Sequence, residues 1–138
     1  MTPEEKARQQ IDLLLQKSGW IIQDRSKVNL AAGPGVAIRE ALLKTGEADY
    51  LLFAGGKAIA TVEAKPQGYT LTGVEEQSGK YGKGLLDIYP NWRDPLPFAY
   101  ESTGSETRFT SRLDPNPRES RRVRISPTRD TYRVRDTS

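Results

Sequence analysis

The segment DYLLFAGGKAIATVEAK, residues 49–65, contains two apolar runs on either side of a glycine pair. Short apolar runs flanking Gly55-Gly56 are typical of a β-hairpin. One expected strand begins at an acid, Asp49, and the other ends in Glu63-Ala64-Lys65. Because residues two apart on a strand share a face, Glu63 and Lys65 should project together.

The length of the hairpin turn decides whether Asp49 shares that face. A two-residue turn at Gly55-Gly56 directs Asp49 away from Glu63. A three-residue loop, residues 54–56, places Asp49 opposite Thr61 and diagonal to Glu63, with backbones about 7 Å apart. Loops of that length usually have glycine at their left-handed position. If the two acids work together, we therefore expect the three-residue loop.

Two carboxylates beside an ammonium group are suited to hold a divalent cation next to a phosphate. The chain has no histidine and no cysteine. Any catalytic metal must then be held by oxygen ligands, which favours Mg²⁺ or Mn²⁺ over Zn²⁺. The alternative is an edge hairpin with scattered surface charges, since Asp…Glu-x-Lys is a short pattern.

Longer strings surround the hairpin. In chain order they are VAIRE (36–40), GEADYLLF (46–53), VEAKP (62–66), GVEEQ (73–77), Tyr81 and PFAYESTG (97–104). Together they resemble the N-terminal nuclease domain of the restriction (R) subunit of type I restriction-modification enzymes, within the PD-(D/E)xK superfamily. The resemblance covers about residues 1–123. Ala48 stands where the superfamily name has proline.

The resemblance implies an α/β fold with a mixed β-sheet flanked by helices, in the order α-β-β-β-α-β. It also implies a Mg²⁺- or Mn²⁺-dependent endonuclease that hydrolyses phosphodiester bonds of double-stranded foreign DNA. Asp49, Glu63 and the Ala64 carbonyl would ligate the metal, and Lys65 would orient the attacking water or stabilise charge on the phosphate. Gln77 and Tyr81 match a Gln-x-x-x-Tyr motif of the same family, which implies a role in holding DNA near the metal. The alternative is a polar residue beside a half-buried tyrosine.

The same resemblance implies partners. Cleavage would take place in a complex with methylation and specificity subunits and an ATP-driven motor. This chain has no Gly-x-x-x-x-Gly-Lys-Ser/Thr phosphate loop, so ATP belongs to the full-length motor alone. Two alternatives remain. One is an inactive remnant, or a DNA-binding or docking module that lacks the motor, and the other is a stand-alone nuclease.

Three further charged residues are candidates for the site. Glu40 ends the strand before the hairpin and could reach the metal, or serve as a structural acid paired with an arginine. Lys80 and Lys83 could contact phosphates, or form a solvated lysine face.

Other elements follow from local pattern. Thr2-Pro3-Glu4-Glu5 predicts a helix start with a capping box. The apolar stripe of that helix is expected at Ala7, Ile11, Leu14 and Leu15. Further strands are expected at 36–40, 98–102 and 107–110, a connection at 43–47, and a second helix from 72 to about 88.

The net charge of +3 is unevenly placed. Residues 118–138 hold seven Arg and three acids, whereas residues 1–117 hold fourteen basic and fifteen acidic groups. We expect a nuclease-like domain at 1–117 and a basic, disordered tail at 118–138. One interpretation of this tail is a reading frame that is truncated or shifted before the helicase motor. The other is a basic arm that binds nucleic acid. No long apolar run predicts a membrane span, and a cytoplasmic setting is expected.

Overall fold

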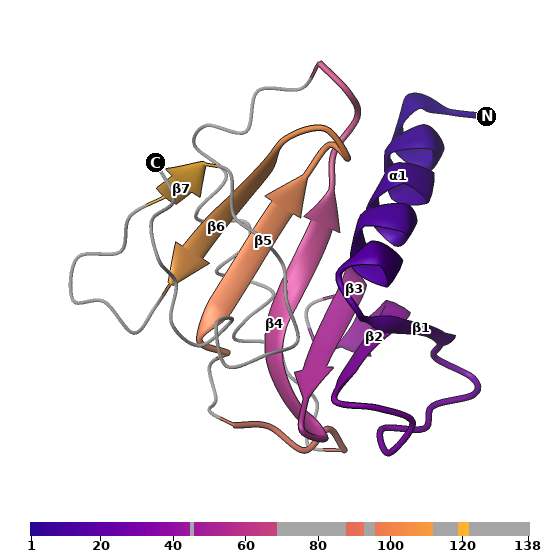
Figure 1. Cartoon of the computed structure of the whole chain (residues 1–138), viewed down its shortest axis with the longest axis vertical. Helices are drawn as coiled ribbons and strands as arrows, with labels where there is room; N and C mark the ends of the chain where they lie inside the picture. Colours follow the sequence, from indigo (N-terminus) through magenta and orange to yellow (C-terminus); the bar gives the residue numbers. More distant parts are fainter. Residues whose placement is uncertain (45, 69–87, 93–95, 112–118, 122–138) are drawn as a thin grey trace.

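The structure is a computed structural model that describes residues 1–44, 46–68, 88–92, 96–111 and 119–121. One helix and seven strands lie in these residues (Figure 1). Their bounds are α1 Pro3–Lys17, β1 Ile21–Asp24, β2 Gly35–Leu43, β3 Gly46–Ala54, β4 Lys57–Ala64, β5 Phe98–Ser102, β6 Thr107–Ser111 and β7 Glu119–Arg121.

The strands form one sheet in the order β1-β2-β3-β4-β5-β6-β7. The pairs β1–β2 and β4–β5 are parallel and the other pairs are antiparallel. The expected α/β fold with a mixed sheet is therefore confirmed. The second helix, expected at 72–88, falls outside the described residues except for Ile88. Strand β7 lies within the range that we assigned to the tail.

Helix α1 begins where the sequence predicts. Thr2 and Glu5 exchange the two hydrogen bonds of a capping box, and Pro3 occupies the first turn. The buried side chains are Ala7, Ile11 and Leu15, spaced by four residues along one face. Leu14 was expected in that stripe, but it is 39% exposed because it lies a quarter-turn away from Leu15.

The β3–β4 hairpin differs from the prediction. Ala54 pairs with Lys57, so the turn has two residues, Gly55 and Gly56, with φ of 59° and 81°. The expected three-residue loop is wrong. Positive φ at both central residues is the requirement of a tight type I′ hairpin turn, which glycine meets without steric cost.

A β-bulge corrects the register further along this hairpin. The pairing shifts between Leu52 and Phe53, so that Leu52 pairs with Ala60 and Tyr50 with Val62. One more step in this register places Asp49 across from Glu63. The bulge therefore brings Asp49 and Glu63 to the same level of the sheet. This alignment could not be predicted from the length of the turn.

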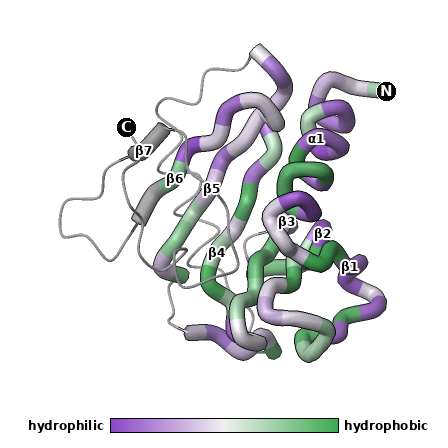
Figure 2. Tube along the Cα trace, viewed as in Figure 1, coloured by the Kyte–Doolittle hydropathy of each residue, from purple (hydrophilic) through white to green (hydrophobic). Residues whose placement is uncertain are grey.

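Two apolar clusters lie on the two sides of the sheet. Helix α1 packs against β1 and β4 and buries the cluster that includes Tyr50, Val62 and Tyr100. The other cluster includes Ile38, Phe53 and Leu96. The middle parts of β3 and β4 are mostly apolar (Figure 2) and buried, as expected for central strands of a sheet. No helix in the described ranges is long and apolar enough to cross a membrane.

Two strand boundaries also differ from expectation. Strand β2 runs to Leu43 and β3 begins at Gly46, so the expected connection at 43–47 is much shorter. The sequence suggested a connection because this stretch is rich in charged residues, and Glu40, within β2, has a φ of 53°, a left-handed conformation that rarely occurs inside a strand. The strand nevertheless continues in register past this residue, from Arg39–Tyr50 to Ala41–Ala48.

Candidate functional site

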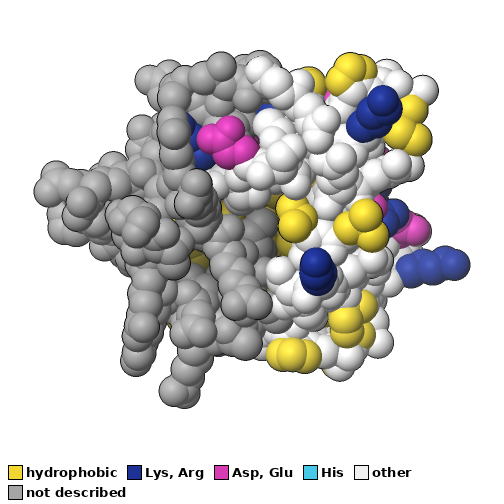
Figure 3. Space-filling view, turned by 45° about the horizontal axis from the view of Figure 1, so that its top comes forward, with side chains coloured by type: hydrophobic (Ala, Val, Ile, Leu, Met, Phe, Trp, Pro, Cys, Tyr) yellow, Lys and Arg dark blue, Asp and Glu magenta, His cyan; other side chains and the backbone are white. Residues whose placement is uncertain are grey.

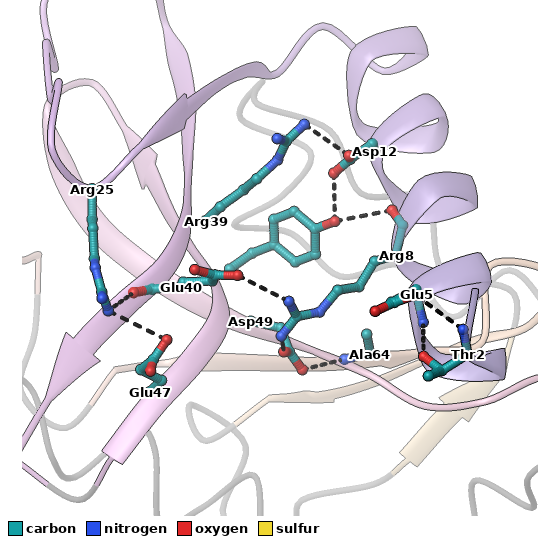
Figure 4. A network of polar contacts seen from close by, with 11 residues as sticks. Thr2, Glu5, Arg8, Asp12, Arg25, Arg39, Glu40, Glu47, Asp49 and Ala64 are labelled. Carbon is teal, nitrogen blue, oxygen red and sulfur yellow. Dashed lines mark hydrogen bonds and ion pairs between the residues drawn. The ribbon is translucent and has the colours of Figure 1, made fainter.

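Asp49 lies near the start of β3, beside the end of β4 (Figure 4). One of its carboxylate oxygens, Oδ2, accepts a hydrogen bond from the Ala64 N–H at 2.8 Å. The other, Oδ1, forms an ion pair with Arg8 of α1. Backbone N–H groups lie close to the plane of a sheet. The Asp49 carboxylate is therefore held in the gap between the two strands, next to the Glu63-Ala64 peptide.

Glu63 and Lys65 come together at the end of β4, as the Glu-x-Lys spacing predicts. The Lys65 Nζ lies 3.9 Å from Glu63 Oε2, and both side chains are largely buried, with exposed fractions of 15% and 8%. The Lys65 N–H donates to the Ser102 carbonyl of β5 at 2.8 Å. Parallel pairing with β5 thus fixes the backbone from which both charged side chains project.

Arg8 contacts two acids at once. Its guanidinium binds Glu40 Oε1 through Nη1 at 3.1 Å and Asp49 Oδ1 through Nη2. Burial favours a lower pKa for Arg8, but hydrogen bonds and charge attraction from Asp49 and Glu40 outweigh it, so the pKa of Arg8 is raised. The side chain is a fixed positive charge between β2 and β3.

Two further contacts tie α1 to the sheet beside Arg8. Arg39 of β2 binds Asp12 of α1 at 2.7 Å, and the Tyr50 hydroxyl contacts both the Asp12 carboxylate and the Arg8 carbonyl. Burial first, and then the hydrogen bond to Asp12, raise the pKa of Tyr50 far above its ordinary value. These contacts set the position of the helix from which Arg8 reaches Asp49.

Four acids occupy one level across four adjacent strands. In the β2–β3 register, Arg39 pairs with Tyr50 and Ala41 with Ala48, so Glu40 lies across from Asp49. Glu63 of β4 pairs with Glu101 of β5. Glu101 in turn pairs with Arg108 of β6. Within the described part of the chain, however, no three of these carboxylates gather closely enough to form a metal-binding set.

The structure thus describes the positions of Asp49, Glu63, Ala64, Lys65 and Glu40. It joins Asp49 to the Ala64 backbone, Lys65 to Glu63, and Glu40 to Asp49 through Arg8. The other predicted site residues, which are Gln77, Tyr81, Lys80 and Lys83, lie outside the described residues.

Sequence reasoning missed Arg8. It lies 41 residues from Asp49 along the chain, on a helix that carries no recognisable motif at that position. The only available signal was that a buried acid in a strand requires a positive partner, which does not say where that partner lies.

The donor set fits a hard dication. Asp49, Glu63 and the Ala64 carbonyl offer oxygen ligands only, which Mg²⁺ and Mn²⁺ prefer. The Asp49 carboxylate already binds a cationic group, the Arg8 guanidinium. These residue types could therefore hold a metal ion, and in the structure the cationic group on Asp49 is Arg8.

Comparison with known proteins finds similarity to restriction enzymes. No protein-family model matches it. It is similar to the type I restriction enzyme EcoKI endonuclease subunit of Escherichia coli (strain K12), with 28% identity over 147 aligned residues. The match covers 78% of this chain and 13% of that relative.

The crystal structure of the type IIG restriction endonuclease BpuSI matches the fold with a TM-score of 0.51 and 14% identity, over 82% of this chain and 12% of that one. The fold of the chain is similar to that of a restriction endonuclease. The resemblance drawn from the sequence and the expected fold class are both confirmed. The domain spans about an eighth of the length of each relative.

Figure 3 shows the charged side chains on one face of the molecule. The Lys and Arg side chains of the described residues form no continuous patch on that face, and some of them lie beside acidic side chains. Sequence-independent binding to DNA requires a basic surface. On that face, the described residues alone do not supply one.

Proposed function

We propose that this domain is the DNA endonuclease unit of a type I restriction R subunit, dependent on Mg²⁺ or Mn²⁺, and that it hydrolyses phosphodiester bonds of double-stranded foreign DNA. One observation carries the proposal: the Asp49 carboxylate is bound to the backbone of Ala64, between Glu63 and Lys65. An acid on one strand is thereby joined to the Glu-x-Lys motif on the next, as the chemistry of such a nuclease requires.

Each residue has a role in this proposal. Asp49 and Glu63, with the Ala64 carbonyl, would hold the dication. When bound, a divalent ion lowers the pKa of a coordinated water and neutralises charge on a phosphate. Lys65, kept beside Glu63 by the parallel pairing of β4 and β5, would orient the attacking water or stabilise charge on the phosphate.

The partners proposed for the domain follow from its relative. Because that relative is an endonuclease subunit of a type I restriction enzyme, we propose that the domain acts in a cytoplasmic complex with methylation and specificity subunits and an ATP-driven motor. Gln77 and Tyr81 would position the DNA, and Lys80 and Lys83 would contact its phosphates.

One observation favours a second function. Arg8 neutralises Asp49 and also binds Glu40, which is the arrangement expected of a structural ion-pair network. A chain that keeps the fold but binds no metal would serve as a DNA-binding or docking module. Metal binding therefore separates the two functions.

The first prediction tests the metal. Asp49→Ala and Glu63→Ala should each weaken Mn²⁺ binding at least about tenfold, because each removes one of two anionic ligands. Isothermal titration calorimetry on the full chain measures this directly. Asp24→Ala is the matched control, since it removes an exposed acid at the end of β1. Supercoiled plasmid with Mg²⁺, Mn²⁺ or EDTA then reports cleavage. Unchanged Mn²⁺ affinity in both site variants would refute the metal assignment.

The second prediction concerns Lys65. Lys65→Ala should keep Mn²⁺ affinity within a few-fold yet reduce cleavage by roughly a hundredfold or more, because a charge that acts in the transition state leaves ground-state binding nearly unaffected. Cleavage is measured in a complex reconstituted with an intact motor and partner subunits. Wild-type cleavage by the variant would remove Lys65 from the mechanism.

A further inference from the structure

Arg8 stands between the candidate metal ligand Asp49 and a second acid, Glu40. The two terminal nitrogens of its guanidinium bind one carboxylate each, from β3 and from β2 (Figure 4). A planar guanidinium suits such a double contact. The two carboxylates differ in surroundings, since Asp49 is 14% exposed and Glu40 is 52% exposed.

Both oxygens of Asp49 are engaged in this arrangement. The Ala64 N–H binds Oδ2 and Arg8 binds Oδ1. A dication that binds either oxygen of Asp49 lies close to the positive charge of Arg8. Two positive groups that close together repel each other strongly, and the low exposure of Asp49 reduces screening by water. Arg8 and a dication therefore compete for Asp49.

Glu40 offers Arg8 a second position. Its carboxylate remains bound to Nη1 if Nη2 leaves Asp49, so Arg8 keeps one ionic partner. The Glu40 backbone is itself fixed, because its carbonyl accepts a hydrogen bond from Arg25 at 3.0 Å and Arg25 also binds Glu47 at 3.3 Å. Glu40 also has a left-handed backbone conformation within β2, with a φ of 53°.

We propose that Arg8 is a positioning residue that holds Asp49 in the metal-free domain, competes with the dication, and moves onto Glu40 when the dication binds. The proposal rests on the metal site of the proposed function. It assigns the helix α1 a part in loading that site, although α1 contributes no ligand. It also gives Glu40 a role that is neither a metal ligand nor a simple structural acid.

Two variants of the full chain should change metal affinity in opposite directions. Arg8→Ala removes the competitor, so Mn²⁺ should bind about tenfold more tightly, as expected from loss of a nearby like charge. Glu40→Gln removes the second position and leaves Arg8 on Asp49, so Mn²⁺ should bind several-fold more weakly. Both affinities are measured by calorimetry at low and high salt.

A double variant and a matched control separate competition from support of the fold. In the Arg8→Ala background, Glu40→Gln should no longer weaken Mn²⁺ binding, because the two residues act through each other. Arg39→Ala breaks the neighbouring contact with Asp12 between α1 and the sheet. It should lower the melting temperature but leave Mn²⁺ affinity within about twofold, because the Tyr50–Asp12 contact and the buried face of α1 still hold the helix, and Arg39 does not touch Asp49.

The outcomes decide between the claims. Tighter binding in Arg8→Ala with weaker binding in Glu40→Gln supports competition. Unchanged or weaker binding in a folded Arg8→Ala variant overturns it and leaves the proposed metal site intact. If Arg8→Ala does not fold, Arg8→Gln and Glu40→Gln carry the same test, and unchanged affinity in both overturns it. Absence of Mn²⁺ binding in the wild type and in every variant overturns the metal site, and the competition with it.

Discussion

The backbone at Glu40 is strained at the level of the sheet where Asp49 lies. Its φ of 53° places a residue with a side chain in the left-handed region. That conformation costs a residue with a Cβ roughly 1–2 kcal/mol. Strain of this kind persists only where the surroundings hold it, and it collects at functional sites. Here the Arg25 and Arg8 contacts hold Glu40 from two sides.

The third prediction isolates this strain. Glu40→Gly and Glu40→Ala both remove the carboxylate, but only glycine takes a positive φ without steric cost. The glycine variant should therefore be more stable than the alanine variant by about 1 kcal/mol, after its greater unfolded-state entropy is counted. Urea unfolding of the two variants measures the difference. If the alanine variant were equally stable, the left-handed backbone would not be set by the fold.

Single residues of the site were predictable only where a short motif marks them. Asp49, Glu63 and Lys65 stand in a pattern that strand periodicity turns into shared faces. Arg8 could not be predicted, because its partnership with Asp49 depends on where α1 packs. The same limit applied to Glu40, for which the sequence left open a metal ligand or an arginine-paired acid, and the structure shows the arginine.

At the scale of elements, the hairpin shows how two local rules combine. The glycine pair predicted a hairpin, which is confirmed, but the loop length inferred from the need to align Asp49 with Glu63 is wrong. The alignment comes from the bulge opposite Leu52 and Phe53. A bulge has no sharp sequence signature, since it depends on packing against both neighbouring strands.

The fourth prediction tests the turn. Nothing lies within 4 Å of a Cβ added at Gly55 or Gly56, so a substitution there meets only the cost of positive φ. Gly55→Asn should change stability by less than about 0.5 kcal/mol, because asparagine is favoured at the first position of such turns. Gly56→Val should lose roughly 1–2 kcal/mol or more, because a β-branched residue at positive φ is strained. Equal losses in thermal unfolding would contradict a type I′ turn.

Helix α1 was the most predictable element. Its capping box and its first turn follow from four consecutive residues, 2–5, and need no distant contact. Its length and buried face follow from the spacing of apolar residues, with the exception of Leu14. The extents of β2 and β3 were harder to predict, because a charged stretch within a strand looks like a connection.

At the scale of the whole molecule, the fold class was implied by the resemblance to a nuclease family, and the mixed sheet agrees with it. Neighbouring strands in the sheet are also successive in sequence. The parallel pairs β1–β2 and β4–β5 were not derivable from local patterns. Each parallel pair is separated by a connection, residues 25–34 or 65–97, that is long enough for the next strand to begin at the same end of the sheet.

The core itself contains one group that its burial should make sensitive to alkali. Tyr100 of β5 is fully buried beside Phe109, with ring centroids 5.0 Å apart. Its hydroxyl has no hydrogen-bond partner among the described residues. Burial raises the pKa of Tyr100 well above its ordinary value of 10.0. The folded chain therefore keeps this proton at a pH where the unfolded chain loses it.

The fifth prediction follows from that difference in proton binding. A raised folded-state pKa gives stability that is fully present below about pH 10 and declines above it, by at most about 1.4 kcal/mol per pH unit for one group. Tyr100→Phe should already stabilise the domain by about 1 kcal/mol at pH 8, because it removes a buried hydroxyl without a partner. Its advantage over the wild type should then grow as the pH rises past 10. Urea unfolding between pH 8 and pH 11 measures both effects. The control is Tyr89→Phe, at a half-buried phenol, whose stability relative to the wild type should depend less on pH. If the difference in unfolding free energy between Tyr100→Phe and the wild type stays constant across that range, Tyr100 does not control the stability of the core at alkaline pH.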